Sequence, residues 1–162
     1  GKVVGRLNDL LCADNVDDRF VTMVLMLLDP KTHELEVVNA GHPSPLWRKP
    51  DGTVECLRQE NGGPLLGVIE GAEYGVAVHS LEPGDTIVIY TDGITEAARA
   101  DGEQYGEVRM QEQFGQPAEN LTAIGKGLID GVMGFAGGDA QGDDICLVCV
   151  ARAGESTGKA SA

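Results

Sequence analysis

Basic residues are scarce in this chain, and their scarcity excludes two classes of partner. Only 12 of the 162 residues are lysine or arginine, against 26 aspartates and glutamates, so the formal net charge is −14. A surface of that sign repels nucleic acid and anionic membranes, and we expect neither as a partner. It also repels a phosphorylated substrate unless a bound metal ion reverses the charge locally. Solubility alone is an equally good reason for such acidity.

Long hydrophobic runs are also missing. The longest, residues 20–28, is interrupted by Thr22, whereas a membrane-spanning helix needs about 20 apolar residues. The chain does not open on the basic and then apolar pattern of a signal peptide. These two absences predict a cytoplasmic protein.

The sequence lacks a complete cysteine motif for zinc or redox chemistry. Cys146 and Cys149 have C-x-x-C spacing, but they lie in DICLVCVA, which is strand-like, and residues three apart on a strand point to opposite faces. No second cysteine pair or cysteine–histidine set completes a zinc site. We therefore predict buried structural thiols. No G-x-S-x-G elbow surrounds Ser44 or Ser80, and no Walker loop is present near residues 125–127.

Hydrophobic periodicity and turn residues predict the secondary structure. Helical repeats occupy residues 2–13, 107–114 and 118–136. Strand-like segments bounded by turn residues lie at 20–29, 35–40, 45–48, 53–57, 74–80, 86–91 and about 144–151. Residues 59–73, rich in glycine, predict a long ordered loop, which in compact domains is often functional.

The order of these elements predicts an α+β fold. The strands at 20–29 and 35–40 form one hairpin and those at 45–48 and 53–57 another, so we expect antiparallel sheets with helices grouped apart. The segment 20–29 is apolar on both faces, which predicts a central strand of a covered sheet. We expect one domain over residues 1–152 and a disordered tail over 153–162.

Acidic residues stand at the borders of two apolar strands. Asp92 follows IVIYT directly, and Asp143 and Asp144 precede ICLVCV. Carboxylates at the rim of a buried sheet are costly to desolvate, and a hard divalent cation is the simplest compensation. Gly93 permits a sharp turn after Asp92. Each acid also has an ordinary explanation, because Asp-Gly is a common turn pair and paired acids are common on surfaces.

A third border feature is NAGHPSPLW at residues 39–47, where a strand ends in small residues and a histidine. His42 could serve as a metal ligand or an acid–base group. A histidine in such a place is more often a hydrogen-bonding strut.

Six segments in this order resemble the SpoIIE-like branch of the metal-dependent type-2C protein phosphatases. They cover nearly all of residues 20–150 and read FVTMVLMLLDP, NAGHPSPLW, GGPLLGV, LEPGDTIVIYTDGITEA, DGEQYG and GGDAQGDDICLVCV. The resemblance implies an αββα-type sandwich of two mainly antiparallel sheets flanked by helices. It also implies two Mn²⁺ or Mg²⁺ ions in the complete domain.

Carried over residue by residue, the resemblance implies that Asp92 and Asp143 are metal ligands, with Asp144 the weaker candidate. Gly93, Asn39 and His42 would shape the surroundings of the site. The implied reaction is hydrolysis of a serine or threonine phosphate by a metal-activated water, without a catalytic acid or base from the protein.

The chain departs from the family pattern at one point. The family's bridging aspartate lies in an upstream G-D-x-x-G-K-G segment, and neither Asp9 nor Asp14 has that context. We therefore expect one metal ligand and the N-terminal strands to be absent from this chain.

Three functions remain open from the sequence. The first is a phosphatase acting on a phosphorylated regulatory protein, by resemblance an anti-sigma-factor antagonist, with an upstream sensor or receiver domain and a homodimer left open. The second is a non-catalytic regulatory or dimerisation module that keeps the fold but has an incomplete metal site. The third is an unrelated acidic α+β binding domain.

Overall fold

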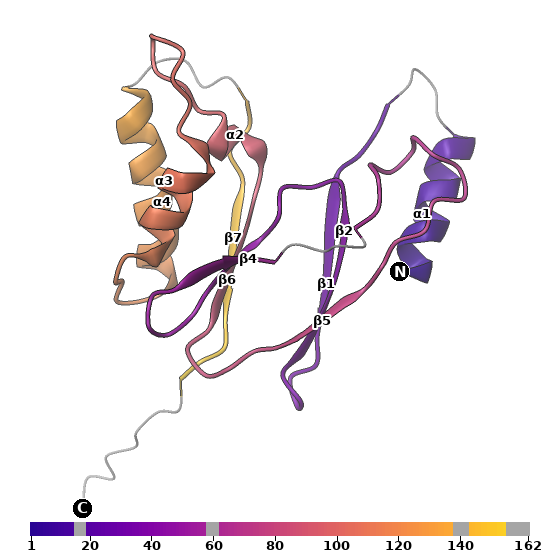
Figure 1. The fold of residues 1–162 in the computed structure, drawn as a ribbon, viewed down its shortest axis with the longest axis horizontal. Helices are drawn as coiled ribbons and strands as arrows, with labels where there is room; N and C mark the ends of the chain where they lie inside the picture. Colours follow the sequence, from indigo (N-terminus) through magenta and orange to yellow (C-terminus); the bar gives the residue numbers. More distant parts are fainter. Residues whose placement is uncertain (15–18, 58–61, 138–142, 155–162) are drawn as a thin grey trace, which may run out of the picture. The chain divides into compact units, whose positions relative to one another are not determined.

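The computed structural model describes residues 1–14, 19–57, 62–137 and 143–154. The chain divides into two compact units, each with its own antiparallel sheet (Figure 1). The first unit comprises residues 1–44 and 58–81, and the second comprises residues 45–57 and 82–162. Two antiparallel sheets with helices confirm the predicted α+β class.

The first unit combines one helix with a three-stranded sheet. It contains α1 (Lys2–Ala13), β1 (Met23–Leu28), β2 (Glu34–Ala40) and β5 (Ala77–Ser80), with the strand order β1-β2-β5. The predicted hairpin is confirmed, because β1 pairs with β2 from Met23 opposite Ala40 to Leu28 opposite Leu35. Val4 of α1 is fully buried in a cluster with residues of β2 and of the loop before β5, which are Val38, Ala40, Leu66 and Tyr74.

The position of β1 in its sheet differs from the prediction. Within the described residues β1 pairs with β2 alone, so β2 is the central strand and β1 an edge strand. Leu27 is 64% exposed, whereas Val37 of β2 is fully buried. The prediction of a central, covered strand is wrong because apolar residues on both faces report side-chain chemistry and not the number of neighbouring strands.

The described part of the glycine-rich segment, residues 62–73, is an ordered loop, as predicted. It is held against α1. The buried side chain of Asn8 donates to the carbonyl of Ile69 at 2.8 Å and accepts from the amide of Gly67 at 3.0 Å. Residues 58–61 lie outside the described residues. The strand that follows is shorter than predicted, because it begins at Ala77 and not at Tyr74.

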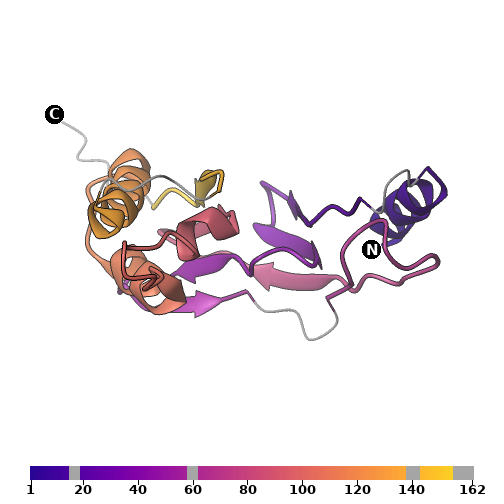
Figure 2. The same cartoon turned by 90° about the horizontal axis from the view of Figure 1, so that it is seen from above.

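The second unit combines three helices with a four-stranded sheet. Its strands are β3 (Leu46–Arg48), β4 (Val54–Cys56), β6 (Thr86–Tyr90) and β7 (Leu147–Ala151), in the order β4-β3-β6-β7. Its helices are α2 (Asp92–Thr95), α3 (Gly106–Gly115) and α4 (Leu121–Ala136). Figures 1 and 2 show α3 and α4 side by side over this sheet. The predicted second hairpin is confirmed by the pairing of β3 with β4.

The core of the second unit lies between its sheet and its helices. Its buried members come from both layers and are Leu46, Val88, Tyr90, Ile94, Tyr105, Met110, Phe114, Leu128 and Val132. The α4 helix begins at Leu121 and not at 118 because the side chain of Asn120 caps it, accepting from the amide of Ala123 at 2.9 Å. Gly137, with φ of 70°, caps its end, so the helix ends at Ala136, as the predicted range of 118–136 has it.

The cysteines only partly match the prediction of buried thiols. Cys146 is exposed, because it precedes β7 and does not lie within it. Cys149 lies inside β7 and is partly buried, and this burial raises the pKa of its thiol. All four cysteines are free.

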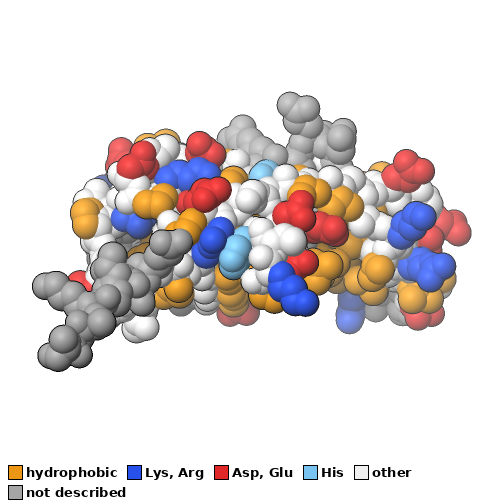
Figure 3. Space-filling model, turned by 90° about the horizontal axis from the view of Figure 1, so that it is seen from below, with side chains coloured by type: hydrophobic (Ala, Val, Ile, Leu, Met, Phe, Trp, Pro, Cys, Tyr) orange, Lys and Arg blue, Asp and Glu red, His pale blue; other side chains and the backbone are white. Residues whose placement is uncertain are grey.

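Acidic and basic side chains are interspersed on the face shown in Figure 3, and the acidic ones do not gather into one patch. The helices of the described residues are all too short or too polar to cross a membrane. Most of the predicted tail, residues 155–162, lies outside the described part of the chain.

Candidate metal and phosphate site

The site is built where β6 ends and the chain turns into α2. Thr91 is the N-cap of α2 and Asp92 is its first residue. The carbonyl of Thr91 accepts from the amide of Ile94 at 3.1 Å, which starts the helix at once. The Asp92 side chain is therefore exposed at the helix start, and its backbone is fixed by the strand on one side and by the helix on the other.

Hydrogen bonds hold this turn beside the segment that leads into β7. The hydroxyl of Thr91 donates to the carbonyl of Asp144 at 2.8 Å and accepts from the amide of Cys146 at 2.9 Å. The amide of Thr91 donates to the carbonyl of Cys146 at 3.1 Å. One residue thus joins the two acidic segments that the sequence singled out.

Gly93 allows these segments to approach closely. A Cβ atom at this position would lie 2.6 Å from the carbonyl oxygen of Asp144, a separation that real Cβ atoms do not show. Gly93 is buried. A glycine is therefore required here for close backbone approach, as well as for the turn that the sequence predicted.

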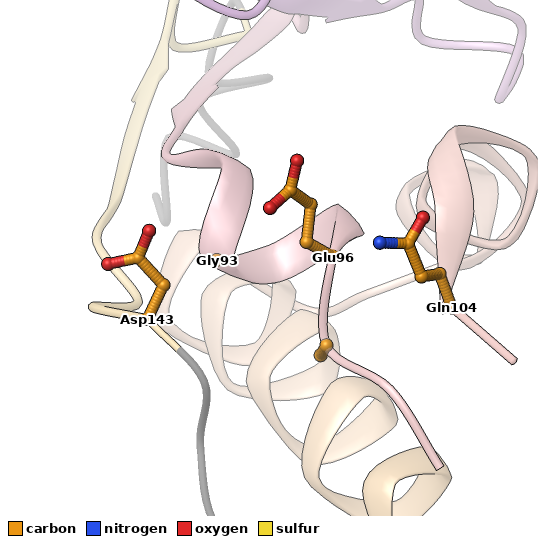
Figure 4. A pocket seen from close by; sticks show the side chains of 5 residues that line it. Gly93, Glu96, Gln104 and Asp143 are labelled. Atoms are coloured by element: carbon orange, nitrogen blue, oxygen red, sulfur yellow. The ribbon is translucent and has the colours of Figure 1, made fainter. Parts of the chain in front are cut away.

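A cavity of about 190 Å³ opens at this point. The described residues that line it come from α2, the loop after α2, and the segment before β7, and they are Gly93, Glu96, Ala97, Gln104 and Asp143. In Figure 4 the Glu96 side chain lies between those of Asp143 and Gln104. Two carboxylates and one amide therefore surround the cavity.

The structure places the predicted acids in different relations to this cavity. Asp143 lines it, and Asp92 lies next to Gly93, which also lines it. The Asp143 carboxylate accepts from the amide of Asp144 at 2.7 Å. Asp144 supplies its carbonyl to Thr91, so its backbone has a structural task. The roles of Asp92, Asp143 and Asp144 as ligands stay predictions.

Asn39 and His42 belong to the first unit and are described within it. The Asn39 amide donates to the carbonyl of His42 at 2.9 Å, and its oxygen accepts from the amide of His42 at 2.8 Å. The His42 ring nitrogen Nδ1 lies 3.0 Å from the hydroxyl of Thr22. These contacts are those of a hydrogen-bonding strut, and a role in shaping the site stays a prediction.

The donor chemistry of the cavity fits a hard divalent cation. Carboxylate oxygens are the protein ligands that Mg²⁺ and Mn²⁺ prefer, and the cavity presents two carboxylates, those of Glu96 and Asp143. Within the described residues no three histidine, cysteine or acidic side chains come together as a metal-binding group. A cation held here would therefore keep open positions for water or for a phosphoryl oxygen.

Two cavity residues were missed by the sequence reasoning. Glu96 had a signal, because it lies four residues after Asp92, and in the structure it is the C-cap of α2. Gln104 had none, because its position depends on how the loop after α2 folds back.

The model of the family described as Stage II sporulation protein E (SpoIIE) matches residues 1–153. The chain belongs to the SpoIIE family. The predicted SpoIIE-like membership is thereby confirmed.

The chain is also similar to parts of longer curated proteins. Protein IcfG of Synechocystis is 28% identical over 150 residues, which cover 90% of this chain and 23% of IcfG. The phosphoserine phosphatase RsbU of Bacillus subtilis is 32% identical over 103 residues, which cover 62% of this chain and 30% of RsbU. The chain thus spans less than a third of the length of either relative.

Solved structures share the fold. The PP2C domain of SiaA from Pseudomonas aeruginosa superposes with a TM-score of 0.78 at 20% identity, covering 92% of this chain and 58% of that one. The phosphatase domain of SpoIIE from Bacillus subtilis, described as Mn presoaked, gives a TM-score of 0.67 at 16% identity, covering 98% and 77%. The chain therefore has the fold of a PP2C-type phosphatase domain.

Proposed function

We propose that this chain is the phosphatase domain of a metal-dependent serine/threonine protein phosphatase. The observation that carries the proposal is the cavity lined by Asp143, Glu96 and Gly93, with Asp92 as the neighbour of Gly93 and the two acidic segments joined through Thr91. Membership of the SpoIIE family and the name of RsbU support the reaction class.

The residues of the cavity suit a binding role and not a proton-transfer role. Asp92 and Asp143 are exposed carboxylates, and they would hold Mn²⁺ or Mg²⁺ together with Glu96. When bound, such an ion lowers the pKa of a coordinated water and neutralises phosphoryl oxygens. The close backbone contact at Gly93 keeps the two acidic segments in fixed relation, so that the ligands need little rearrangement.

The substrate we propose is a phosphorylated regulatory protein, specifically an anti-sigma-factor antagonist. The support is the likeness to RsbU, which is named a phosphoserine phosphatase. An upstream sensor or receiver domain and a homodimer belong to the same proposal.

One observation favours the second candidate, a regulatory or dimerisation module with an incomplete metal site. The described residues contain no group of three donors arranged for a metal ion. This candidate shares the fold and differs only in lacking turnover.

Hydrolysis of an aryl phosphate with and without Mn²⁺ tests the proposal. We expect Asp92→Asn and Asp143→Asn each to lower Mn²⁺-dependent turnover by at least about tenfold, because each removes a charged ligand. Asp130→Asn is the matched control, since that carboxylate pairs with Lys126 on the exposed side of α4.

The assay is run on this chain and on a version extended upstream. We expect the extended version to be active and Mn²⁺-dependent, and this chain alone to be weakly active or inactive, because the ion would have too few ligands. Robust Mn²⁺-dependent turnover by this chain alone would contradict that expectation. Wild-type turnover in both acid variants would rule out the site. An extended version without Mn²⁺-dependent turnover would favour the regulatory module.

A further inference from the structure

The loop between α2 and α3, residues 96–105, forms one wall of the cavity through Ala97 and Gln104. Binding of a metal ion by the carboxylates would give this wall no role. Among the described residues that line the cavity, Gln104 has the only side chain that can donate a hydrogen bond, because Glu96 and Asp143 are acceptors when ionised.

The backbone of this loop is fixed at both ends. Ala98 and Gln104 form an antiparallel bridge, and the amide of Tyr105 donates to the carbonyl of Ala97 at 2.8 Å. Between them the amide of Arg99 donates to the carbonyl of Glu103 at 2.9 Å. The loop is thus a closed turn whose ends cannot move apart without breaking several hydrogen bonds.

Two arginines lock the turn from outside. Arg99 and Arg109 both pair with Glu103, and both lie over the ring of Phe135, at 4.1 and 4.7 Å from its centroid. Arg109 also donates to the carbonyl of Gln104 at 3.0 Å. The position of Gln104 is therefore determined by the same guanidinium that neutralises Glu103.

The side chain of Gln104 is not used by this network. Its amide forms no hydrogen bond with another described residue, and Figure 4 shows it on the cavity side, next to Glu96. By contrast, the side-chain amide of Gln111 donates to the sulfur of Cys56, and that of Gln116 donates to the carbonyl of Glu112. A rigid wall that presents a free amide to a cavity lined by acids is suited to an anionic ligand that arrives with a cation.

We propose that Gln104 is a substrate-contact residue whose amide donates to a phosphoryl oxygen in the cavity, with Arg109 as its positioning residue. This inference rests on the proposed phosphatase function. A neutral donor orients the phosphoryl group without competing with the cation for the carboxylates, whereas the positive charge of an arginine or lysine at this place would compete with it.

Steady-state kinetics of the upstream-extended chain with an aryl phosphate and Mn²⁺ are the first test. We expect Gln104→Leu, which keeps the approximate volume and removes the donor, to raise KM by about tenfold and to change kcat less, since a hydrogen bond to a charged group is lost. The affinity for Mn²⁺, measured by calorimetry, stays within about twofold because Gln104 is not a ligand. Gln116→Leu is the control and leaves KM unchanged.

A phosphate titration that needs no turnover separates this inference from the phosphatase proposal. Inorganic phosphate is added to the chain in Mg²⁺, and the side-chain amide signals of Gln104 and Gln116 are followed by NMR, with the Gln104→Leu spectrum giving the assignment. We expect the Gln104 signals to shift and those of Gln116 to stay.

An upstream-extended chain without Mn²⁺-dependent hydrolysis would defeat the phosphatase proposal, whereas a shift of the Gln104 amide with phosphate would still support the contact. An unmoved Gln104 amide, or a Gln104→Leu variant with the wild-type KM, overturns it.

Discussion

At the scale of single residues, Thr91 and Gly93 do more to build the site than the acids themselves. Thr91 uses its hydroxyl both as donor to Asp144 and as acceptor from Cys146, and so joins the end of β6 to the start of β7. Gly93 removes the one atom that would keep the segments apart. The acids can then remain exposed, with no requirement that they hold the fold together.

Gly93→Ala tests this close approach. The added Cβ would meet the carbonyl of Asp144 at 2.6 Å, and a backbone atom cannot move aside as a flexible side chain can. We expect the free energy of unfolding, measured by urea denaturation, to fall by about 1–3 kcal/mol. We expect Mn²⁺-dependent hydrolysis to fall as well, because the two acidic segments separate.

Gly134→Ala is the control for that substitution. Gly134 lies within α4 and nothing lies within 4 Å of the Cβ it would gain, so alanine should stabilise the chain by up to about 1 kcal/mol. If Gly93→Ala and the wild-type chain had the same free energy of unfolding, the segments around Asp92 and Asp144 could move apart without destabilising the chain.

At the scale of elements, one side chain ties the turn between α2 and α3 to α3 itself. Arg109 belongs to α3, yet it pairs with Glu103 and donates to the carbonyls of Gln104 and Tyr105. Its guanidinium therefore joins the start of α3 to the cavity wall. A lysine could keep the charge but not the several hydrogen bonds.

Arg109→Ala is expected to raise KM about as much as Gln104→Leu does, because it frees the wall that presents Gln104. The loss of stability should be only about 1 kcal/mol, since the ion pair is exposed. In the double variant the two effects on KM should not multiply, because both act through the same amide. Arg109→Lys should restore part of the affinity.

Lys126→Ala is the control for a lost surface ion pair, because Lys126 pairs with Asp130 and its side chain is 72% exposed. It should change neither KM nor stability measurably. Independent, multiplying effects of Gln104→Leu and Arg109→Ala would contradict a shared mechanism.

The elements that the sequence predicted correctly are those defined by neighbours in the chain. The helical periodicity of 2–13 and 118–136 and the hairpin of 45–48 with 53–57 are local signals, and the structure has α1, α4 and the β3–β4 hairpin there. The predicted central position of β1 in its sheet is wrong, because strand position depends on pairing between segments far apart in the sequence.

The same division applies to the cavity. Asp143 could be found at a strand border, and Glu96 one helical turn after Asp92, but Gln104 depends on a bridge to Ala98 and on Arg109.

At the scale of the whole molecule, the net charge of −14 acts on every charged ligand. It concentrates cations near the surface and disfavours a phosphate dianion until a cation is bound. On the face shown in Figure 3 the acidic side chains are spread out, so no single patch of that face accounts for this attraction. The proposed site would therefore take up its metal ion before its substrate.

A salt titration of Mn²⁺ binding tests this long-range contribution. We expect the apparent affinity, measured by calorimetry, to fall by about threefold or more between about 20 mM and about 200 mM salt, because screening shortens the reach of distant carboxylates. Glu82→Lys replaces a negative charge with a positive one in the turn before β6. This turn lies at the opposite end of β6 from Asp92. This variant should weaken Mn²⁺ binding at low salt and match the wild-type chain at high salt, since it touches no ligand. Affinity that is the same at both salt concentrations would mean that the cation responds only to the carboxylates that contact it.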